Sequence, residues 1–117
     1  MGANALFDRN GQPVFFHLDN GRIIGLAGQS VAWLKGPNVY DYQGSHRGWW
    51  EGDHVRGRDG GVVAWMRDAN LGLMKPLPSL PPLAPLPSLE PLRPLPQLPP
   101  LRPLRRPIWS VYSLDGS

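Results

Sequence analysis

The chain has 117 residues, including 14 glycines and 15 prolines, and carries a net charge of +3. The lack of cysteine excludes disulfides, thiolate nucleophiles and cysteine metal sites, and fits a reducing compartment. No apolar run approaches the ~18 residues that a membrane-spanning helix needs, and so small a net charge is typical of an ordinary solvated surface. We therefore expect a cytoplasmic protein with no transmembrane segment and no nucleic-acid partner; peripheral contact with lipid stays open.

Residues 1–70 contain four copies of one unit, whose glycines are spaced 17, 16 and 16 residues apart. These glycines are Gly11, Gly28, Gly44 and Gly60. A large aromatic residue follows each glycine by five positions: Phe16, Trp33, Trp49 and Trp65. An aliphatic residue precedes each glycine by five positions: Leu6, Ile23, Val39 and Val55. Fixed periods of this kind are the signature of a repeat architecture.

Each unit has the pattern of a β-hairpin. Asn10-Gly11 and Asp59-Gly60 are strong two-residue hairpin signals, which predict positive φ at both turn positions. The flanking runs are short, alternate in character and are rich in β-branched and aromatic residues, and no apolar stripe has the helical period. We expect an all-β fold in which about eight strands close into a shallow, pseudo-four-fold barrel that removes its exposed edges.

Two interpretations of the repeated aromatic residues stay open. In the first they are simply core, because aromatic side chains provide the largest burial per residue. In the second they line a central cup or channel that holds an elongated apolar or amphipathic molecule. The lining would be Phe16, Trp33, Trp49 and Trp65, with candidates on the opposite face at His17, Leu34, Trp50 and Met66.

Several short motifs carry a family resemblance: Leu6-Phe7-Asp8-Arg9-Asn10-Gly11-Gln12-Pro13-Val14, Val31-Ala32-Trp33, Asn38-Val39-Tyr40 and Gly48-Trp49-Trp50. Together with the Pro/Leu tract and the closing Trp109-Ser110, they resemble the four-fold β-flower domain family. The resemblance implies a shallow symmetric barrel of hairpins, in a family without an assigned biochemical role. A distant likeness of such folds to tubby-type barrels suggests lipid or amphiphile binding. The resemblance supplies no site residues to carry over.

A second region starts in the low seventies, where the composition changes to proline and leucine. From Met74 every third residue is apolar, as far as Leu104: Leu77, Leu80, Leu83, Leu86, Leu89, Leu92, Leu95, Leu98 and Leu101 lie between them. A period of three with intervening prolines predicts a polyproline II rod of roughly 90 Å, too long to lie straight on a module about 30 Å across. The tract must bend back, pair with other copies or await a partner. We expect a homo-oligomer joined along these leucines, because a disordered linker needs no such register.

The same tract supports an alternative function. Arg93, Pro96 and Pro99 form a basic residue followed by PxxP, which SH3-like domains bind, although a three-residue period produces such matches by itself. After the tract, residues 108–114 alternate like a short final strand. The expected domains are therefore a barrel at 1–70, the Pro/Leu tract at 71–107, and a terminal strand and tail at 108–117.

Catalytic chemistry has little support in the sequence. His17, His46 and His54 are dispersed, and Asp53 and Asp59 fall at turn positions, where aspartate bonds to its own backbone. We expect no enzyme, no metal site and no cofactor. The leading hypothesis is a binding protein for an apolar or amphipathic molecule, and the alternative is a self-assembling scaffold recognised through its proline tract.

Overall fold

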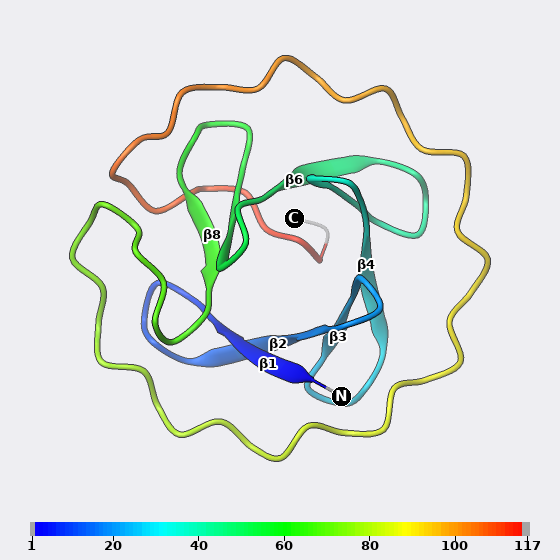
Figure 1. Cartoon of the computed structure of the whole chain (residues 1–117), viewed down its shortest axis with the longest axis horizontal. Coiled ribbons are helices and arrows are strands. Elements are labelled where there is room, and N and C mark those ends of the chain that lie inside the picture. The colour runs from blue at the N-terminus through cyan, green and yellow to red at the C-terminus, as the bar shows by residue number, and fades with distance from the viewer. Residues whose placement is uncertain (1, 116–117) are drawn as a thin grey trace.

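Eight antiparallel strands form a closed barrel in the computed structural model, which describes residues 2–115. The strands are β1 (Ala3–Phe7), β2 (Pro13–Leu18), β3 (Arg22–Gly25), β4 (Ser30–Lys35), β5 (Asn38–Tyr40), β6 (His46–Trp50), β7 (His54–Arg56) and β8 (Val62–Trp65). Each strand pairs with the next, and β1 closes the barrel on β8 through Phe7 and Trp65. The expected all-β barrel of four hairpins is therefore confirmed (Figure 1).

The four repeats share one structural irregularity. The pairing register shifts at the same place in each odd-numbered strand: Leu6/Phe7, Ile23/Ile24, Val39/Tyr40 and Val55/Arg56. A bulge of this kind bends a strand and increases its twist. Four equivalent bends let short strands curve into a narrow barrel and send each hairpin outward as a petal (Figure 1).

The petal turns differ from the type expected from Asn-Gly and Asp-Gly. In the first petal the N–H of Gly11 donates to the carbonyl of Asp8 at 3.0 Å, and the N–H of Asp8 donates to the carbonyl of Gln12 at 2.9 Å. Gly11 has φ +77°, and no residue other than glycine has positive φ among those described. The prediction of positive φ at Asn10 and Asp59 is wrong. Each petal is a type I turn followed by a left-handed glycine, which also suits the twist of a hairpin.

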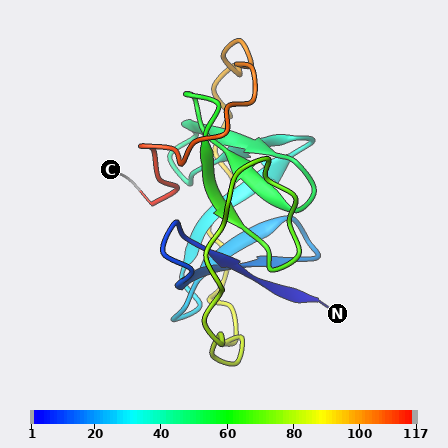
Figure 2. The ribbon, with the colours of Figure 1, turned by 90° about the vertical axis from the view of Figure 1, so that its left-hand side faces the viewer.

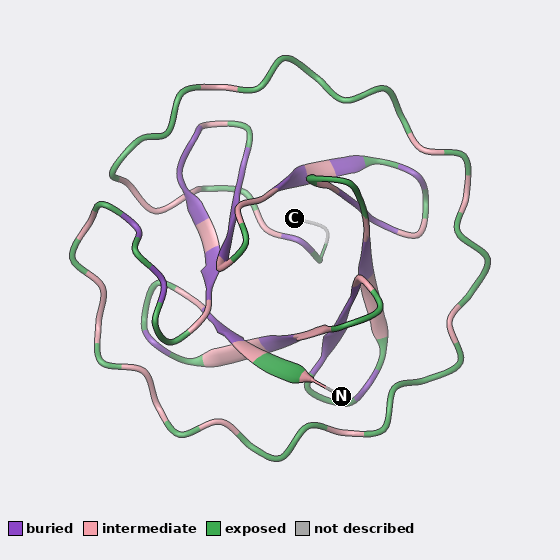
Figure 3. Cartoon of the chain, viewed as in Figure 1, coloured by how far each residue is buried: buried purple, intermediate pink, exposed green. Residues whose placement is uncertain are grey.

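The inside of the barrel is a packed apolar core. Leu6, Ile23, Val39 and Val55 are fully buried there, one from each repeat. Across from them lie Phe15, Ala32 and Ala64, with Gly48 in the third repeat. These residues come from all eight strands and form one packed cluster inside the barrel. Figure 3 shows the buried stretches of the strands in purple.

The Pro/Leu tract runs around the barrel as a belt, a name used here for residues 74–107 (Figure 1). It contains no helix or strand. The 34 residues of the belt, at roughly 3.1 Å per residue, extend over about 105 Å, which is close to the circumference of a circle about 34 Å across. The molecule is a disc of 37 × 36 × 24 Å, so the belt has the length needed to encircle it once. Seen edge-on, the belt lies around the waist of the disc (Figure 2).

The closing segment crosses one face of the disc, opposite to the start of β1 (Figure 2). Trp109 forms a single parallel bridge with Val62, and the N–H of Ser110 donates to the carbonyl of Val62 at 2.8 Å. The short final strand predicted for residues 108–114 is thus reduced to one bridge. Beyond it, Leu114 enters the barrel core.

Candidate functional site

One backbone–backbone hydrogen bond per petal attaches the belt to the barrel. The carbonyls of the four petal glycines, a name used here for Gly11, Gly28, Gly44 and Gly60, each accept one hydrogen bond from the belt at 2.8–3.0 Å. The donors are, in this order, the backbone N–H groups of Ser79, Ser88, Gln97 and Arg106. These donors are nine residues apart, which is three times the three-residue period of the tract. Proline has no N–H to donate, so the tract needs another residue type at each of these positions.

The petal glycines are also points of close approach between belt and barrel. A Cβ on Gly44 would come within 2.6 Å of the carbonyl oxygen of Leu95, and one on Gly11 within 2.7 Å of that of Leu77. Their φ values are +88° and +77°, a region that side chains disfavour. Glycine is needed here both for the turn and for the contact with the belt.

The apolar side chains of the belt point away from the barrel. They are 88–96% exposed, which makes them the most exposed large hydrophobic residues of the described chain. We call this set the leucine rim: Met74, Leu77, Leu80, Leu83, Leu86, Leu89, Leu92, Leu95, Leu98, Leu101 and Leu104. The tract was expected to bend back, to pair with other copies or to await a partner, and in the structure it bends back onto its own barrel. Its leucines nevertheless remain exposed to solvent (Figure 3).

The four repeated aromatic residues lie outside the barrel wall, between barrel and belt. Their neighbours in the strands point inward, and alternation along a strand directs the aromatic side chains outward. Arg93 of the belt lies 5.5 Å over the ring of Trp33, and Lys75 lies 5.2 Å over that of Trp65. The structure places Phe16, Trp33, Trp49 and Trp65 in the layer that supports the belt, where all four are buried, and not around the barrel axis as the cup hypothesis expected.

The opposite-face candidates do come together, at one mouth of the barrel. Leu34, Trp50 and Met66 pack against the barrel core. His17 stacks on Trp50 with ring centroids 4.3 Å apart, across the barrel from the first repeat to the third. We call this end the histidine mouth. Stacked rings cover it, so it is not an open channel.

The other end, here called the valine mouth, is closed by the chain itself. Val14, Val31 and Val63 pack at this end of the core, where Arg47 takes the place of the fourth valine. Leu114 is 1% exposed and belongs to the same cluster. Two open pockets of about 280 and 470 Å³ flank it.

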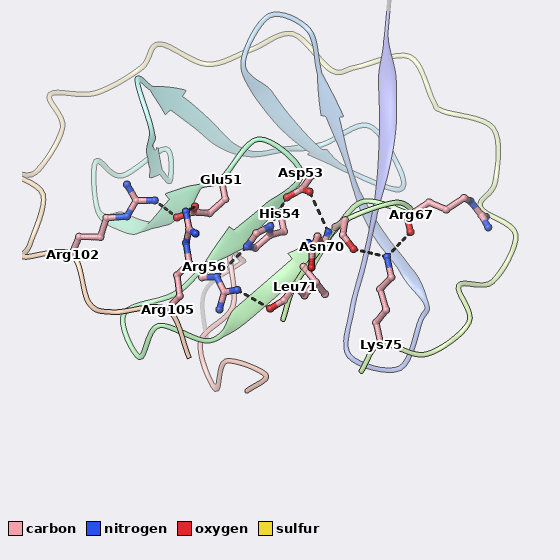
Figure 4. A network of polar contacts seen from close by, with 11 residues as sticks. Glu51, Asp53, His54, Arg56, Arg67, Asn70, Leu71, Lys75, Arg102 and Arg105 are labelled. Atoms are coloured by element: carbon pink, nitrogen blue, oxygen red, sulfur yellow. Dashed lines mark hydrogen bonds and ion pairs between the residues drawn. The ribbon is translucent and has the colours of Figure 1, made fainter. Parts of the chain in front are cut away.

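A network at the fourth repeat joins the two ends of the belt (Figure 4). Arg56 is buried and donates to the carbonyl of Leu71, before the belt, at 2.9 Å. It also donates to the carbonyl of Arg106, at the end of the belt, at 2.8 Å. Its Nε donates to His54 at 3.0 Å, and the Arg102 and Arg105 side chains pair with Glu51 nearby. Arg56 therefore closes the ring of belt around the barrel.

The residues of the proline-motif alternative are partly occupied within the molecule. Arg93 donates to Glu90 at 2.8 Å and covers Trp33. Pro96 is half-buried and Pro99 is exposed. An SH3-like domain would have to take the arginine from its intramolecular partners before it could use it in recognition.

The geometry agrees with the result of comparison with known proteins. The model of the family described as 4-fold beta flower protein matches residues 4–116. This chain belongs to that family. The match extends over barrel, belt and closing segment, so all three are parts of a beta flower protein. No curated protein and no solved structure matches the chain.

Two titratable groups of this beta flower protein are strongly perturbed, and both lie where belt and barrel meet. Desolvation, with a smaller effect of the Arg58 charge, lowers the pKa of His46 to about 4. Desolvation and the bond to Glu90 raise the pKa of Tyr42 to about 12. Within residues 2–115 no three His, Cys, Asp or Glu side chains are grouped to hold a metal ion. That part of the chain also contains no helix long and apolar enough to cross a membrane.

Sequence reasoning missed the nine-residue period of the belt and the role of Arg56. The period was readable: Pro76, Pro85, Pro94 and Pro103 recur every nine residues, and the non-proline donors follow each by three. Three belt turns per petal would have placed the tract around its own barrel. Arg56 gave no such signal, because the equivalent positions hold Phe7, Ile24 and Tyr40.

Proposed function

We propose that this protein is a non-enzymatic assembly module that binds further copies of itself through the leucine rim. The observation that carries the proposal is the exposure of the rim: eleven large apolar side chains, each 88–96% exposed, at every third position of the belt. Burying one such side chain contributes about 1.5–3 kcal/mol. A monomer in water leaves all of that stabilisation unused.

The shape of the rim supports an open, planar assembly. Two convex discs touch along a short arc, so each contact covers only a few leucines on each copy. Interfaces of this size are weak one at a time, well below the ~1,200 Å² of a stable pair. The rim is nearly the same on all sides, which favours repeated edge-to-edge contacts over one closed dimer. We expect association that rises continuously with concentration.

Because the barrel axis is filled, the leucine rim is a better candidate for the functional surface than a central channel. The axis is occupied by core side chains, and both mouths are covered. A channel ligand would need an open lumen, whereas the rim is available without any rearrangement. The proline-motif alternative is weakened by the pairing of Arg93 with Glu90.

Sedimentation velocity on matched variants tests the proposal. The triple variant Leu83→Gln, Leu92→Gln, Leu101→Gln spreads three polar side chains around the rim. It should sediment as a monomer at concentrations where the unmodified protein forms larger species. Its unfolding midpoint should stay unchanged, because the replaced side chains are exposed.

The control changes the exposed proline before each of these leucines: Pro82→Ala, Pro91→Ala, Pro100→Ala. It alters the same three places and leaves every leucine present, so it should associate like the unmodified protein. Equal sedimentation of the leucine variant and the unmodified protein at all concentrations would contradict the proposal.

A further inference from the structure

Leu114 occupies the valine mouth as an isolated apolar anchor. It is 1% exposed, whereas Val111 and Tyr112 just before it are 82% and 43% exposed. Asp115 after it is also exposed. A single aliphatic side chain of the closing segment is therefore inserted into a core that otherwise belongs to the strands.

The surroundings of Leu114 are divided between apolar and polar. On one side the pocket of about 280 Å³ is bordered mostly by apolar side chains, with one carboxylate at its edge: Val14, Phe15, Leu26 and Val63, and Asp8. On the other side the pocket of about 470 Å³ is bordered by polar and charged groups, including Gln29, Asp41, Tyr42 and Arg47. Leu114 and Asp115 border both pockets, so displacing them would join the two spaces into one amphipathic site.

Arg47 is the charged group that breaks the four-fold pattern. The other repeats place Val14, Val31 and Val63 at its position. Arg47 bonds Asp41 through Nε at 2.9 Å, which uses one of the five N–H donors of a guanidinium. Although desolvation would raise it, the pKa of Asp41 is held below its ordinary value by the N–H groups of Gln43 and Ser45 and by Arg47. Asp41 therefore remains a fixed anion that orients Arg47.

From this arrangement we infer that the valine mouth is a binding site for a medium-chain aliphatic carboxylate. The aliphatic chain takes the place of the Leu114 side chain in the barrel core. The carboxylate enters the pocket that Arg47 and Asp115 both border and pairs with the remaining donors of Arg47. Leu114 then acts as an internal competitor for the aliphatic chain of such a ligand. This site is separate from the leucine rim and does not depend on self-association.

Calorimetric titration with octanoate tests the site on the full chain. The variant Leu114→Gly removes the competing side chain, and we expect it to bind octanoate about tenfold or more tighter than the unmodified protein, from the burial of one leucine. Val111→Gly is the matched control, because it makes the same kind of change in the same segment at a side chain exposed to solvent. Its affinity should equal that of the unmodified protein.

The head group is tested by comparing octanoate with 1-octanol. In the Leu114→Gly background, Arg47→Gln should weaken octanoate binding about tenfold and leave octanol binding unchanged. An equal loss for both compounds, or none for either, would overturn the assignment of Arg47 to the carboxylate.

A second experiment uses the unmodified protein, so it does not require the Leu114→Gly variant to fold. The methyl resonances of Leu114 should move from a buried to a solvent-exposed position as octanoate is added. Two results would overturn the site: Leu114 resonances that stay unchanged at saturating octanoate, or folded Leu114→Gly that binds no tighter than Val111→Gly.

Discussion

The barrel and the belt both repeat their apolar residues at a fixed period, but these residues are buried in the barrel and exposed in the belt. In the barrel, Leu6, Ile23, Val39 and Val55 are fully buried. In the belt, the leucines are 88–96% exposed at an equally regular spacing. Apolar periodicity therefore identifies one face of a segment, and does not by itself say whether that face points to the core.

The direction of each face follows from where the backbone bonds. The strands bond laterally to each other, which leaves both faces of the wall free for side chains. The belt has no partner strand and bonds inward, through one N–H in nine residues, to the petal glycines. The side of the belt that carries these N–H groups must face the barrel, so the leucines face outward.

The largest expected effect comes from opening the belt at its closure. Arg56→Met removes the bonds to the carbonyls of Leu71 and Arg106 and should lower the free energy of unfolding by about 3 kcal/mol or more. Arg58→Met, an exposed neighbour, should cost less than 1 kcal/mol. Urea unfolding measures both. Equal stability of the two variants would mean that the belt contributes little to the fold.

A second pair of variants isolates the contact between petal and belt. Gly44 and Gly52 both have positive φ, +88° and +94°, but only Gly44 has a belt carbonyl against it. Gly52→Ala should cost about 1–2 kcal/mol from its backbone conformation alone. Gly44→Ala should cost about 1–3 kcal/mol more, because the added Cβ displaces Leu95 and the bond from Gln97. Thermal unfolding of both would show no difference if the belt were only loosely held.

A smaller effect is expected from His46, which is buried where the belt crosses the third petal. Its pKa is about 4 in the folded state against 6.5 when unfolded, so the neutral form is favoured by folding. Stability should be complete above pH 6.5 and should fall by about 2 kcal/mol between pH 7 and pH 5. His46→Phe should flatten this profile in urea unfolding. An imidazole of His46 that titrates near 6.5 by NMR would show that this layer is open to solvent.

Much of the barrel could be predicted from the sequence, and the position of the belt could not. The glycine and aromatic spacing defined the four hairpins, because strand alternation repeats in each unit. The same spacing assigned Trp33 and Trp49 to the wrong side of the wall, since alternation alone does not say which face encloses the axis. The belt is held on the barrel by the N–H groups of Ser79, Ser88 and Gln97, which bond to carbonyls up to about 70 residues earlier in the chain. Nothing in the local pattern revealed that Leu114 would enter the core.

The most direct test of the central claim is imaging of the unmodified protein on a flat support at rising concentration. If the leucine rim joins the copies, the particles should grow sideways as sheets one disc thick, about 24 Å high, with neighbours spaced by the 36–37 Å width of the disc. Stacks that grow in height, or isolated discs at every concentration, would contradict the assignment of the rim as the contact surface.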